Sequence, residues 1–456
     1  MAMDKRILPI LLASLATVLD RFTRRCIIRH QFARRHGCQP VARSFNKEPF
    51  LGLDTLPGTI RALRQHRILE KGCELYRDYG NTFTITELQR QAILTIEPEN
   101  IKTILSLNFK DYGISFRLAP FKPLLGEGIF DTDGEHWAAS RALIRPSFSR
   151  DQVVDLTELE NLIQDLFVLL PRDGETVVDL LDLFFRYTID SATEFLFGQS
   201  VGTLKKMQSE LGTLGPLNIF YRDRKAEECN RICREFVQQF VDEAFNTVED
   251  KKGTEEKRHK RIFSHELAWG TPNKNRVLDE LMNVLLAGRD TTTSLLSNLF
   301  FMLAKNPAIW DKLRREVASL QGRPPTYEEL RSLKYVQCCV NEYGLSPVFE
   351  PKGILVGYNV YAMHRRKDIY GADADEFHPE RWEDGKLQPR WGYLPFNGGP
   401  RICIGQRYAL TEVTYLLVRM AQEFAALQSR ESGPWVESLT LTLCPRNGTR
   451  VCLVPA

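Results

Sequence analysis

One cysteine stands in a glycine-rich segment whose residues could hold a metal ion. The segment Phe396–Gly405 reads FNGGPRICIG and contains Cys403. Gly398 and Gly399 permit a tight loop, and the helix expected after it would direct N–H groups and a positive dipole toward the sulfur, which favours a thiolate. A lone cysteine is most often a small buried hydrophobe. In this setting, however, a thiolate would suit the axial ligation of haem iron.

Three further residues of this segment could serve such a cofactor. Phe396 can shield the sulfur from water, and Arg401 can reach an anionic group nearby. Gly405 allows close approach at the point where the helix begins. The segment is therefore a candidate cofactor loop.

A second group of polar residues interrupts a long apolar stretch. Residues 278–303 have helical apolar spacing, and Ala287–Thr292 (AGRDTT) lies midway along them. The ordinary structural interpretation is that a threonine bonds to the helix backbone and that the aspartate faces solvent. Gly288 costs a helix interior about 0.5–1 kcal/mol relative to alanine. Something should offset that cost, and the close approach of a ligand is one candidate.

Trp137 and Arg141 are four residues apart in the segment GEHWAASRALIRPSF, which we expect to be helical. This spacing places both side chains on one face of a helix. A stacked tryptophan–arginine pair at the surface would explain them without any function. Alternatively, the planar fork of the arginine suits a carboxylate.

These motifs resemble those of the cytochromes P450. The haem-binding signature of that family, Phe-x-x-Gly-x-Arg-x-Cys-x-Gly, matches Phe396–Gly405 at every specified position. The resemblance implies haem b as cofactor, with Cys403 as the metal ligand and Arg401 on a propionate. The Trp137–Arg141 pair is similar to the pair that holds a propionate in this family. The implied cofactor-binding residues are Trp137, Arg141, Phe396, Arg401, Cys403 and Gly405.

The AGRDTT segment resembles the oxygen-binding groove of the same family. There the threonine hydrogen-bonds dioxygen, and the preceding acid helps to deliver protons. The catalytic residues that the resemblance implies are therefore Asp290 and Thr291.

The sequence departs from the family pattern after Glu342. Phe377–Trp382 is similar to the family's Pro-Glu-Arg segment, whose arginine normally joins a buried network with an upstream Glu-x-x-Arg motif. Here Leu345 stands where the second arginine would be, and a few dozen residues of the family's K-helix region are missing. We expect Glu342 and Arg381 to be incompletely paired, which would destabilise the fold by about 3–5 kcal/mol if they stayed buried. Some relaxation of the pair toward solvent would follow. Glu328–Arg331 fits the bare spacing, and we interpret it as a chance match on an exposed helix.

The expected fold class is mainly α with small β-sheets, as in the cytochrome P450 fold, with a long central helix over the haem. Helices are predicted at 178–196, 278–303 and 405–423, with a charged surface loop at 249–261. Strands are predicted at 82–86, 92–96 and 353–358, and in the tail at LTLTL (439–443) and VCLV (451–454). The stretch between Gln199 and Cys229 is shorter than expected, so the roof over the substrate cavity would be reduced.

The amino terminus predicts a membrane anchor. Ile7–Leu19 carries no charge and precedes an arginine-rich stretch. As a helix it would span roughly 20 Å, short of the roughly 30 Å hydrocarbon core, so a full span would need flanking residues. An uncleaved anchor with a cytosolic basic flank fits the charge asymmetry, and a helix lying in the membrane interface is the alternative. A cleaved signal peptide fits less well, because the basic charge follows the apolar run. We therefore expect an anchor at 1–33 and a haem-thiolate domain at 34–456.

Composition narrows the remaining choices. The net charge of +3 over 456 residues gives no reason to expect nucleic acid as a partner. The ten cysteines show neither disulfide-rich nor zinc-type spacing, which indicates a reducing compartment or the cytosolic side of a membrane. No nicotinamide or flavin fingerprint is present in the chain, which agrees with an external electron donor.

Several stretches resemble the fungal branch of the family that hydroxylates alkanes and fatty acids. They are Arg35–Pro40, Pro49–Asp54, Leu286–Thr292 and Val360–Gly371. The resemblance implies a monooxygenase at the endoplasmic reticulum membrane, with its catalytic domain facing the cytosol. It would use O2 and an NADPH-dependent cytochrome P450 reductase to hydroxylate a small hydrophobic substrate, an n-alkane or fatty acid, at its terminal carbon.

Two other functional hypotheses follow from the same residues. The missing segment, which either a mispredicted gene or a degenerate copy would explain, could make the chain a non-catalytic or haem-poor remnant. A haem-thiolate isomerase that uses no dioxygen is a third hypothesis, against which the intact Asp290–Thr291 pair argues.

Overall fold

The computed structural model describes residues 41–44, 52–87, 90–148, 155–205, 224–250, 262–342, 350–351 and 355–456, with scattered residues between 20 and 37. The expected anchor Ile7–Leu19 and Leu345 lie outside the described residues, as does most of the region between Gln199 and Cys229. Among the helices that are described, none combines the length and apolar character needed to cross a bilayer.

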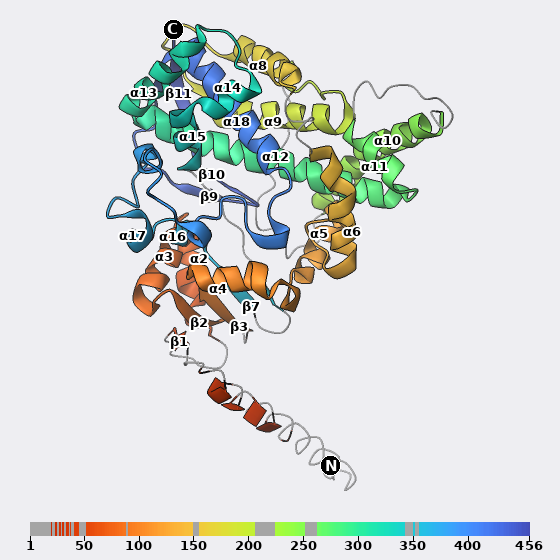
Figure 1. The fold of residues 1–456 in the computed structure, drawn as a ribbon, viewed down its shortest axis with the longest axis vertical. Helices are drawn as coiled ribbons and strands as arrows, with labels where there is room; N and C mark the ends of the chain where they lie inside the picture. The colour runs from red at the N-terminus through yellow and green to blue at the C-terminus, as the bar shows by residue number, and fades with distance from the viewer. Residues whose placement is uncertain are drawn as a thin grey trace.

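The described part of the chain is mainly helical, as expected (Figure 1). The helices before the central one are α2 (Leu56–Arg64), α3 (Ile68–Tyr79), α4 (Pro98–Lys102), α5 (Leu118–Leu125), α6 (Gly134–Ile144), α8 (Thr157–Leu169), α9 (Leu180–Phe197), α10 (Arg224–Asp250) and α11 (Phe263–Gly270). The central helix and those after it are α12 (Lys274–Lys305), α13 (Pro307–Val317), α14 (Tyr327–Ser332), α15 (Lys334–Asn341), α16 (Val360–Met363), α17 (Lys367–Tyr370) and α18 (Gln406–Glu423).

The described strands form small sheets beside the helices. The largest described sheet has the order β1–β2–β3–β7, with strands at Ala42–Arg43, Thr82–Glu87, Arg90–Thr95 and Leu355–Tyr358. Strands β2 and β3 are antiparallel, whereas β3 and β7 are parallel with Ala92 opposite Leu355. The other sheets join β5 (Val178–Asp179), β11 (Arg450–Pro455) and β8 (Phe424–Ser429), then β9 (Glu437–Leu439) and β10 (Leu443–Pro445), then β4 (Tyr112–Gly113) and β6 (Glu350–Pro351).

Two predicted elements differ from the structure. The tail segment LTLTL was expected to be one strand, but it is a hairpin in which β9 ends at Leu439 and β10 begins at Leu443. The N–H of Thr440 donates to the carbonyl of Thr442 at 2.9 Å, which closes the turn. The charged stretch expected as a loop from 249 begins later, because α10 continues to Asp250. The rest of that stretch lies outside the described residues.

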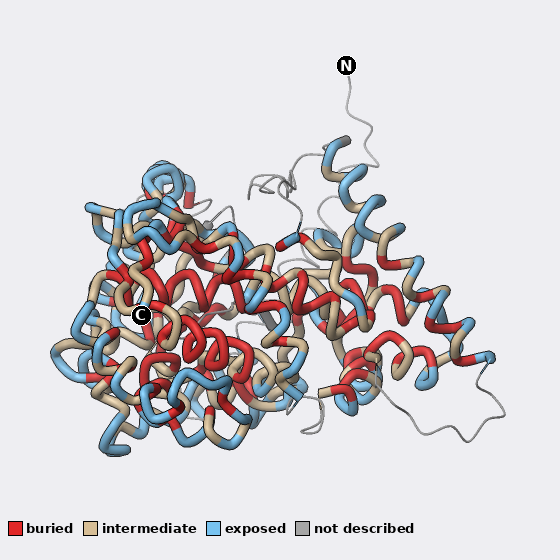
Figure 2. The backbone as a smooth tube through the Cα atoms, turned by 90° about the horizontal axis from the view of Figure 1, so that it is seen from above, coloured by how far each residue is buried: buried red, intermediate tan, exposed pale blue. Residues whose placement is uncertain are grey.

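Helix α12 crosses the whole helical body and contacts α9, α10, α13 and α18 (Figure 1). It begins at an Asn273 cap, whose side chain accepts from the N–H of Arg276 at 3.1 Å, and it ends before Pro307. Around it, Phe184, Phe300 and Trp310 belong to the largest hydrophobic cluster. Figure 2 shows the buried turns of the helices gathered inside an exposed outer layer. This packing fixes the position of the central helix.

Candidate cofactor and active site

The cysteine loop closes on itself before α18 begins. The N–H of Cys403 donates to the carbonyl of Phe396 at 2.9 Å, and the N–H of Ile402 donates to the carbonyl of Gly399 at 3.1 Å. Gly405 is the residue that precedes the first turn of α18. The sequence therefore predicted correctly that a tight loop leads from Phe396 into a helix.

Two glycines of this loop meet the rest of the protein at very close range. Gly399 has a φ of +64°, and a Cβ atom there would lie 1.8 Å from the carbonyl oxygen of Leu105. At Gly398 a Cβ would lie 2.6 Å from the ring of Trp391. At Gly405 the nearest atom would be a ring carbon of Phe148 at 3.4 Å, which is ordinary contact. The requirement for glycine is therefore strong at 398 and 399 and weak at 405.

The Cys403 side chain is accessible although protein surrounds it. Cys403 is exposed, and its neighbour Ile402 is 38% exposed. Burial raises the pKa of Cys403, and this outweighs the lowering by the backbone hydrogen bond from Gly405 and by Arg141. The helix end therefore lowers the pKa of Cys403 as expected, but burial has the larger effect and the net shift is upward. A metal cation on the sulfur would reverse the balance, since coordination deprotonates a thiol.

Trp137 and Arg141 lie on α6, and the structure brings them to the cysteine loop. Trp137 is 9% exposed and packs against Phe109 at 5.3 Å between ring centroids. The guanidinium of Arg141 lies 5.9 Å from the Trp137 ring, and its Nη2 donates to the carbonyl of Ile402 at 2.9 Å. The arginine lies over the tryptophan ring, but the surface pair of the structural alternative is wrong, because Trp137 is buried and the pair lies against the loop that carries Cys403.

Arg401 is a buried cation with a protein partner. Its Nη2 lies 2.6 Å from Oδ1 of Asp133, and its guanidinium lies 4.6 Å from the Trp137 ring. The pKa of Arg401 is lowered to about 10, mainly by burial, with repulsion from Arg117 and Arg141 adding to the lowering and Asp133 opposing it. Three guanidinium groups thus gather beside the cysteine loop, an arrangement that attracts anionic groups. The sequence interpretation missed Asp133, whose place one residue before α6 was the available signal.

Thr291 and Asp290 lie in the middle of α12. The hydroxyl of Thr291 donates to the carbonyl of Ala287 at 2.7 Å, the backbone bond that the structural alternative expected. Asp290 does not face solvent freely, because its Oδ1 accepts from Nη1 of Arg289 at 3.0 Å. Burial raises the pKa of Asp290, and Arg289 opposes this.

The reason for Gly288 differs from the one expected. A Cβ atom at Gly288 would lie 3.3 Å from the Cβ of Ala192 on α9. The close approach that the glycine permits is therefore between two helices, and no ligand is needed to explain it.

The centre of α12 is nevertheless unusually open for a core helix. Residues 280–283 and 292–301 are buried, whereas 284–290 are half-buried and Thr291 is exposed. Three features would suit a flat metal macrocycle that carries carboxylates. They are the accessible stretch of α12 between two buried runs, the accessible thiol on the cysteine loop, and the group of guanidiniums beside that loop. The residues present therefore fit a haem.

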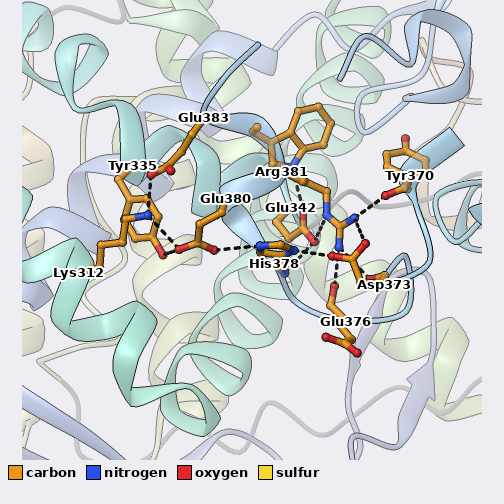
Figure 3. A network of polar contacts seen from close by, with 11 residues as sticks. Lys312, Tyr335, Glu342, Tyr370, Asp373, Glu376, His378, Glu380, Arg381 and Glu383 are labelled. Atoms are coloured by element: carbon orange, nitrogen blue, oxygen red, sulfur yellow. Dashed lines mark hydrogen bonds and ion pairs between the residues drawn. The ribbon is translucent and has the colours of Figure 1, made fainter. Parts of the chain in front are cut away.

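The Glu342–Arg381 pair is complete in the structure, which corrects the expectation of broken pairing (Figure 3). Each side chain is 8% exposed, and Nε of Arg381 lies 2.9 Å from Oε1 of Glu342. The N–H of His378 and the indole N–H of Trp382 also donate to Glu342, at 3.0 and 2.7 Å. Arg381 further donates to the carbonyls of Tyr370, Asp373 and Glu376. The pair has not relaxed toward solvent because neighbouring donors and acceptors satisfy both groups. Glu328 and Arg331 are exposed on α14, as expected of a chance match.

Comparisons with known proteins agree with these features. The family model described as Cytochrome P450 matches residues 55–343 and 348–453. The chain is 43% identical to cytochrome P450 monooxygenase himC of Aspergillus japonicus, over 91% of this chain and 84% of that protein. It is 42% identical to cytochrome P450 monooxygenase FPY7 of Fusarium mangiferae, over 93% and 91% respectively. It is 35% identical to cytochrome P450 52A13 of Debaryomyces hansenii, over 93% of each.

These matches confirm the family resemblance drawn from the motifs, including its fungal alkane and fatty-acid hydroxylase branch. The family model covers most of the chain, and the relatives are similar along nearly their full length. The chain therefore belongs to the cytochrome P450 family, whose cofactor is haem b held by a cysteine thiolate.

Proposed function

We propose that Cys403 is the axial ligand of the haem and that the chain hydroxylates long-chain n-alkanes or fatty acids at the terminal carbon. The observation that carries this proposal is the convergence of Arg141, Arg401 and Cys403 on one loop. Arg141 donates to the carbonyl of Ile402, the residue before Cys403, and both guanidiniums lie near the Trp137 ring. When bound, a haem with a thiolate ligand supplies oxygen activation, because the thiolate favours O–O cleavage.

The residues of the cysteine loop and α6 would bind and orient the cofactor. Arg401 and Arg141 would each turn toward a propionate, the anion that a guanidinium fork recognises. Trp137 stacks near both guanidiniums and limits their movement. Phe396 would shield the Cys403 sulfur, and Gly405 would aim its N–H at that sulfur, consistent with the backbone hydrogen bond that lowers the pKa of Cys403.

Asp290 and Thr291 would manage protons at the centre of α12. Burial raises the pKa of Asp290, so its carboxyl takes up a proton more readily than a solvated aspartate does. The Thr291 hydroxyl is exposed and keeps acceptor capacity while it donates to Ala287. Arg289 holds Asp290 at 3.0 Å and thereby orients it.

The substrate assignment rests on the relatives and on the apolar character of the open turn of α12. Several relatives are named cytochrome P450 52A, and they are 35–38% identical to this chain. Val284, Leu285 and Leu286 are half-buried at the start of the open stretch of α12, and the accessible Thr291 lies at its end. An aliphatic chain would gain free energy by leaving water for such a surface, about 0.8 kcal/mol for each CH2 group that is buried.

Three further parts of the proposal concern the chain as a whole. The electrons would come from an NADPH-dependent cytochrome P450 reductase. Residues 1–33 would anchor the domain 34–456 at the endoplasmic reticulum, with that domain facing the cytosol. Finally, residues would be missing after Glu342. The family model leaves 344–347 unmatched between its two segments, and the alignments with himC and with cytochrome P450 52A13 extend over 466 and 488 positions, more than the 456 residues of this chain.

The test is the spectrum of the reduced, haem-loaded protein with carbon monoxide. The wild type should show the Soret shift of a thiolate ligand, and Cys403→Ala should lose it. Cys73→Ala, at a half-buried cysteine on α3, is the matched control and should keep it. A thiolate signal that survives in Cys403→Ala would reject the ligand assignment, and a wild type that binds no haem would favour the non-catalytic remnant.

Thr291→Ala should keep the thiolate signal but uncouple oxygen consumption from product formation. NADPH consumption, peroxide release and terminal hydroxylation of a fatty acid would be measured together with the reductase. More peroxide and less product per NADPH are expected, because the variant lacks the hydroxyl beside Asp290. An unchanged ratio of product to NADPH would contradict the role given to Thr291.

A further inference from the structure

The beginning of the cysteine loop is held by a segment that lies 30 residues earlier in the sequence. Helix α16 directly follows β7, and His364 is the residue at its carboxyl end. The N–H of His364 donates to the carbonyl of Val360 at 2.8 Å, which fixes the histidine backbone. Its ring is stacked on Tyr393 at 5.3 Å and lies edge-on to Tyr370 at 6.0 Å. The imidazole therefore has one well-defined orientation.

In this orientation His364 accepts a hydrogen bond from the chain just before the cysteine loop. The N–H of Leu394 donates to Nε2 of His364 at 3.0 Å, and Leu394 is 5% exposed. Since a backbone N–H can only donate, Nε2 must carry a lone pair, and the imidazole is neutral with its proton on Nδ1. Burial lowers the pKa of His364 to about 3, with Arg365 adding to the effect, which agrees with a neutral ring.

A second contact from the same segment holds the other end of the same turn. The hydroxyl of Tyr358 donates to Oδ1 of Asn397 at 3.0 Å, and Tyr358 is 1% exposed. Asn397 has a φ of +64°, a left-handed conformation that is rare outside glycine. Its N–H donates to the carbonyl of Leu394 at 3.3 Å. Leu394 and Asn397 are thus each fixed by one side chain of residues 358–364.

Phe396 lies between these two fixed positions, and its carbonyl accepts the N–H of Cys403. The position of Cys403 therefore depends on Phe396, and that of Phe396 on the two contacts that flank it. We propose that His364 is a positioning residue for Cys403, acting as a neutral acceptor that fixes the start of the cysteine loop, with Tyr358 as its partner at Asn397. This inference rests on the proposed ligand role of Cys403.

The experiment compares two substitutions that differ in acceptor capacity. His364→Gln keeps an acceptor near the position of Nε2, whereas His364→Phe keeps a ring without one. Hydrogen exchange is measured in the peptide that contains Leu394, and the thiolate-type Soret shift of the reduced carbon monoxide complex is measured at equal haem content. In His364→Phe the exchange of the Leu394 amide should accelerate by about tenfold or more, because a buried N–H loses its acceptor. The thiolate signal should fall as well, while His364→Gln stays near the wild type in both.

His364→Phe that matches the wild type in both measurements would overturn the proposal, as would His364→Gln that behaves like His364→Phe. If His364→Phe does not accumulate as folded protein, Tyr358→Phe removes only the hydroxyl at Asn397. It should accelerate exchange in the same peptide, and unchanged exchange there would also overturn the proposal. Failure of the ligand assignment is distinguishable, because it would appear as a thiolate signal in Cys403→Ala while the exchange differences persisted.

Discussion

Two buried carboxylic acids have pKa values raised to about 7, mainly because burial penalises the carboxylate. One is Glu280 on α12, and the other is Glu412 on α18. Glu412 is 1% exposed and lies beside Ser191 and Thr292, whose hydrogen bonds lower its pKa without offsetting burial. Within the described part of the chain, its Oε1 has no hydrogen-bond partner. At neutral pH these groups carry a proton part of the time, which links the stability of the fold to pH.

We predict that Glu412→Gln makes the protein more stable at pH 8 than the wild type, but not at pH 5. The folded state binds a proton at Glu412 up to about pH 7, whereas the unfolded chain releases it near the ordinary glutamate value of 4.5. Stability is therefore fully present below that lower value and is lost as pH rises through about 7. Denaturant unfolding at both pH values should show a gain on the order of 2 kcal/mol at pH 8. An equal effect at both pH values would contradict a raised pKa at Glu412.

The sequence indicated most of the candidate site but not its electrostatics. The spacing of Trp137 and Arg141 predicted one helical face, and the loop signature predicted how Phe396 leads to Cys403. The direction of the Cys403 pKa shift depends on how much protein surrounds the sulfur, and a local pattern does not contain this. A local pattern also does not contain the contacts of His364 and Asp133, because their partners Leu394 and Arg401 lie 30 and 268 positions away.

At the scale of elements, long periodic helices were predictable and tertiary contacts were not. Helices α12 and α18 have apolar spacing over many turns, so their existence followed from the sequence. The reason for a glycine at position 288 could not be predicted, because it is the close approach of Ala192 on a different helix. The expected weakness at Glu342 was wrong for a similar reason. Its additional donors come from the chain around His378 and Trp382, whose approach depends on the folded arrangement.

We predict that Glu342 and Arg381 strongly couple the end of α15 to the turn Pro379–Trp382. Arg381→Ala should lower the free energy of unfolding by about 3–5 kcal/mol, because it leaves a buried carboxylate without its cation. In a double-mutant cycle, Glu342→Gln together with Arg381→Ala should cost less than the sum of the single effects, by about 1 kcal/mol or more. Strict additivity of the two substitutions would show that the buried pair is not coupled.

Lys312 and Glu380 provide the matched control within the same network (Figure 3). Their side chains are 33% and 32% exposed, with 3.0 Å between Nζ and Oε1. Lys312→Ala should cost less than Arg381→Ala, since a half-buried ion pair is closer to solvent than the buried Glu342–Arg381 pair. The contrast between the two pairs separates burial from mere proximity of charges.

At the scale of the whole molecule, the described structure has apolar side chains on its surface at the end where α2 and β1 lie (Figure 1). Leu53, Ile60 and Leu63 are 43–47% exposed in and just before α2, and Arg61 and Arg64 lie among the last residues of that helix. The four-stranded sheet and α3 lie at this same end (Figure 1). Any membrane attachment through residues 1–33 would bring this surface toward the lipid headgroups, where apolar side chains and arginines are both favourable.

We predict that removing residues 1–33 releases the chain from membranes without changing its cofactor site. Flotation with vesicles containing anionic lipid would compare the full chain with the chain from residue 34. Binding should fall by more than about tenfold on truncation, because the apolar run Ile7–Leu19 supplies most of the area that lipid can bury. Some binding should persist through α2, and Ile60→Ser together with Leu63→Ser should remove it.

The truncated chain should keep the thiolate-type signal with carbon monoxide, because the cysteine loop and α6 make no described contact with residues 1–33. Equal flotation of both chains would refute the anchor and assign membrane binding to the catalytic domain.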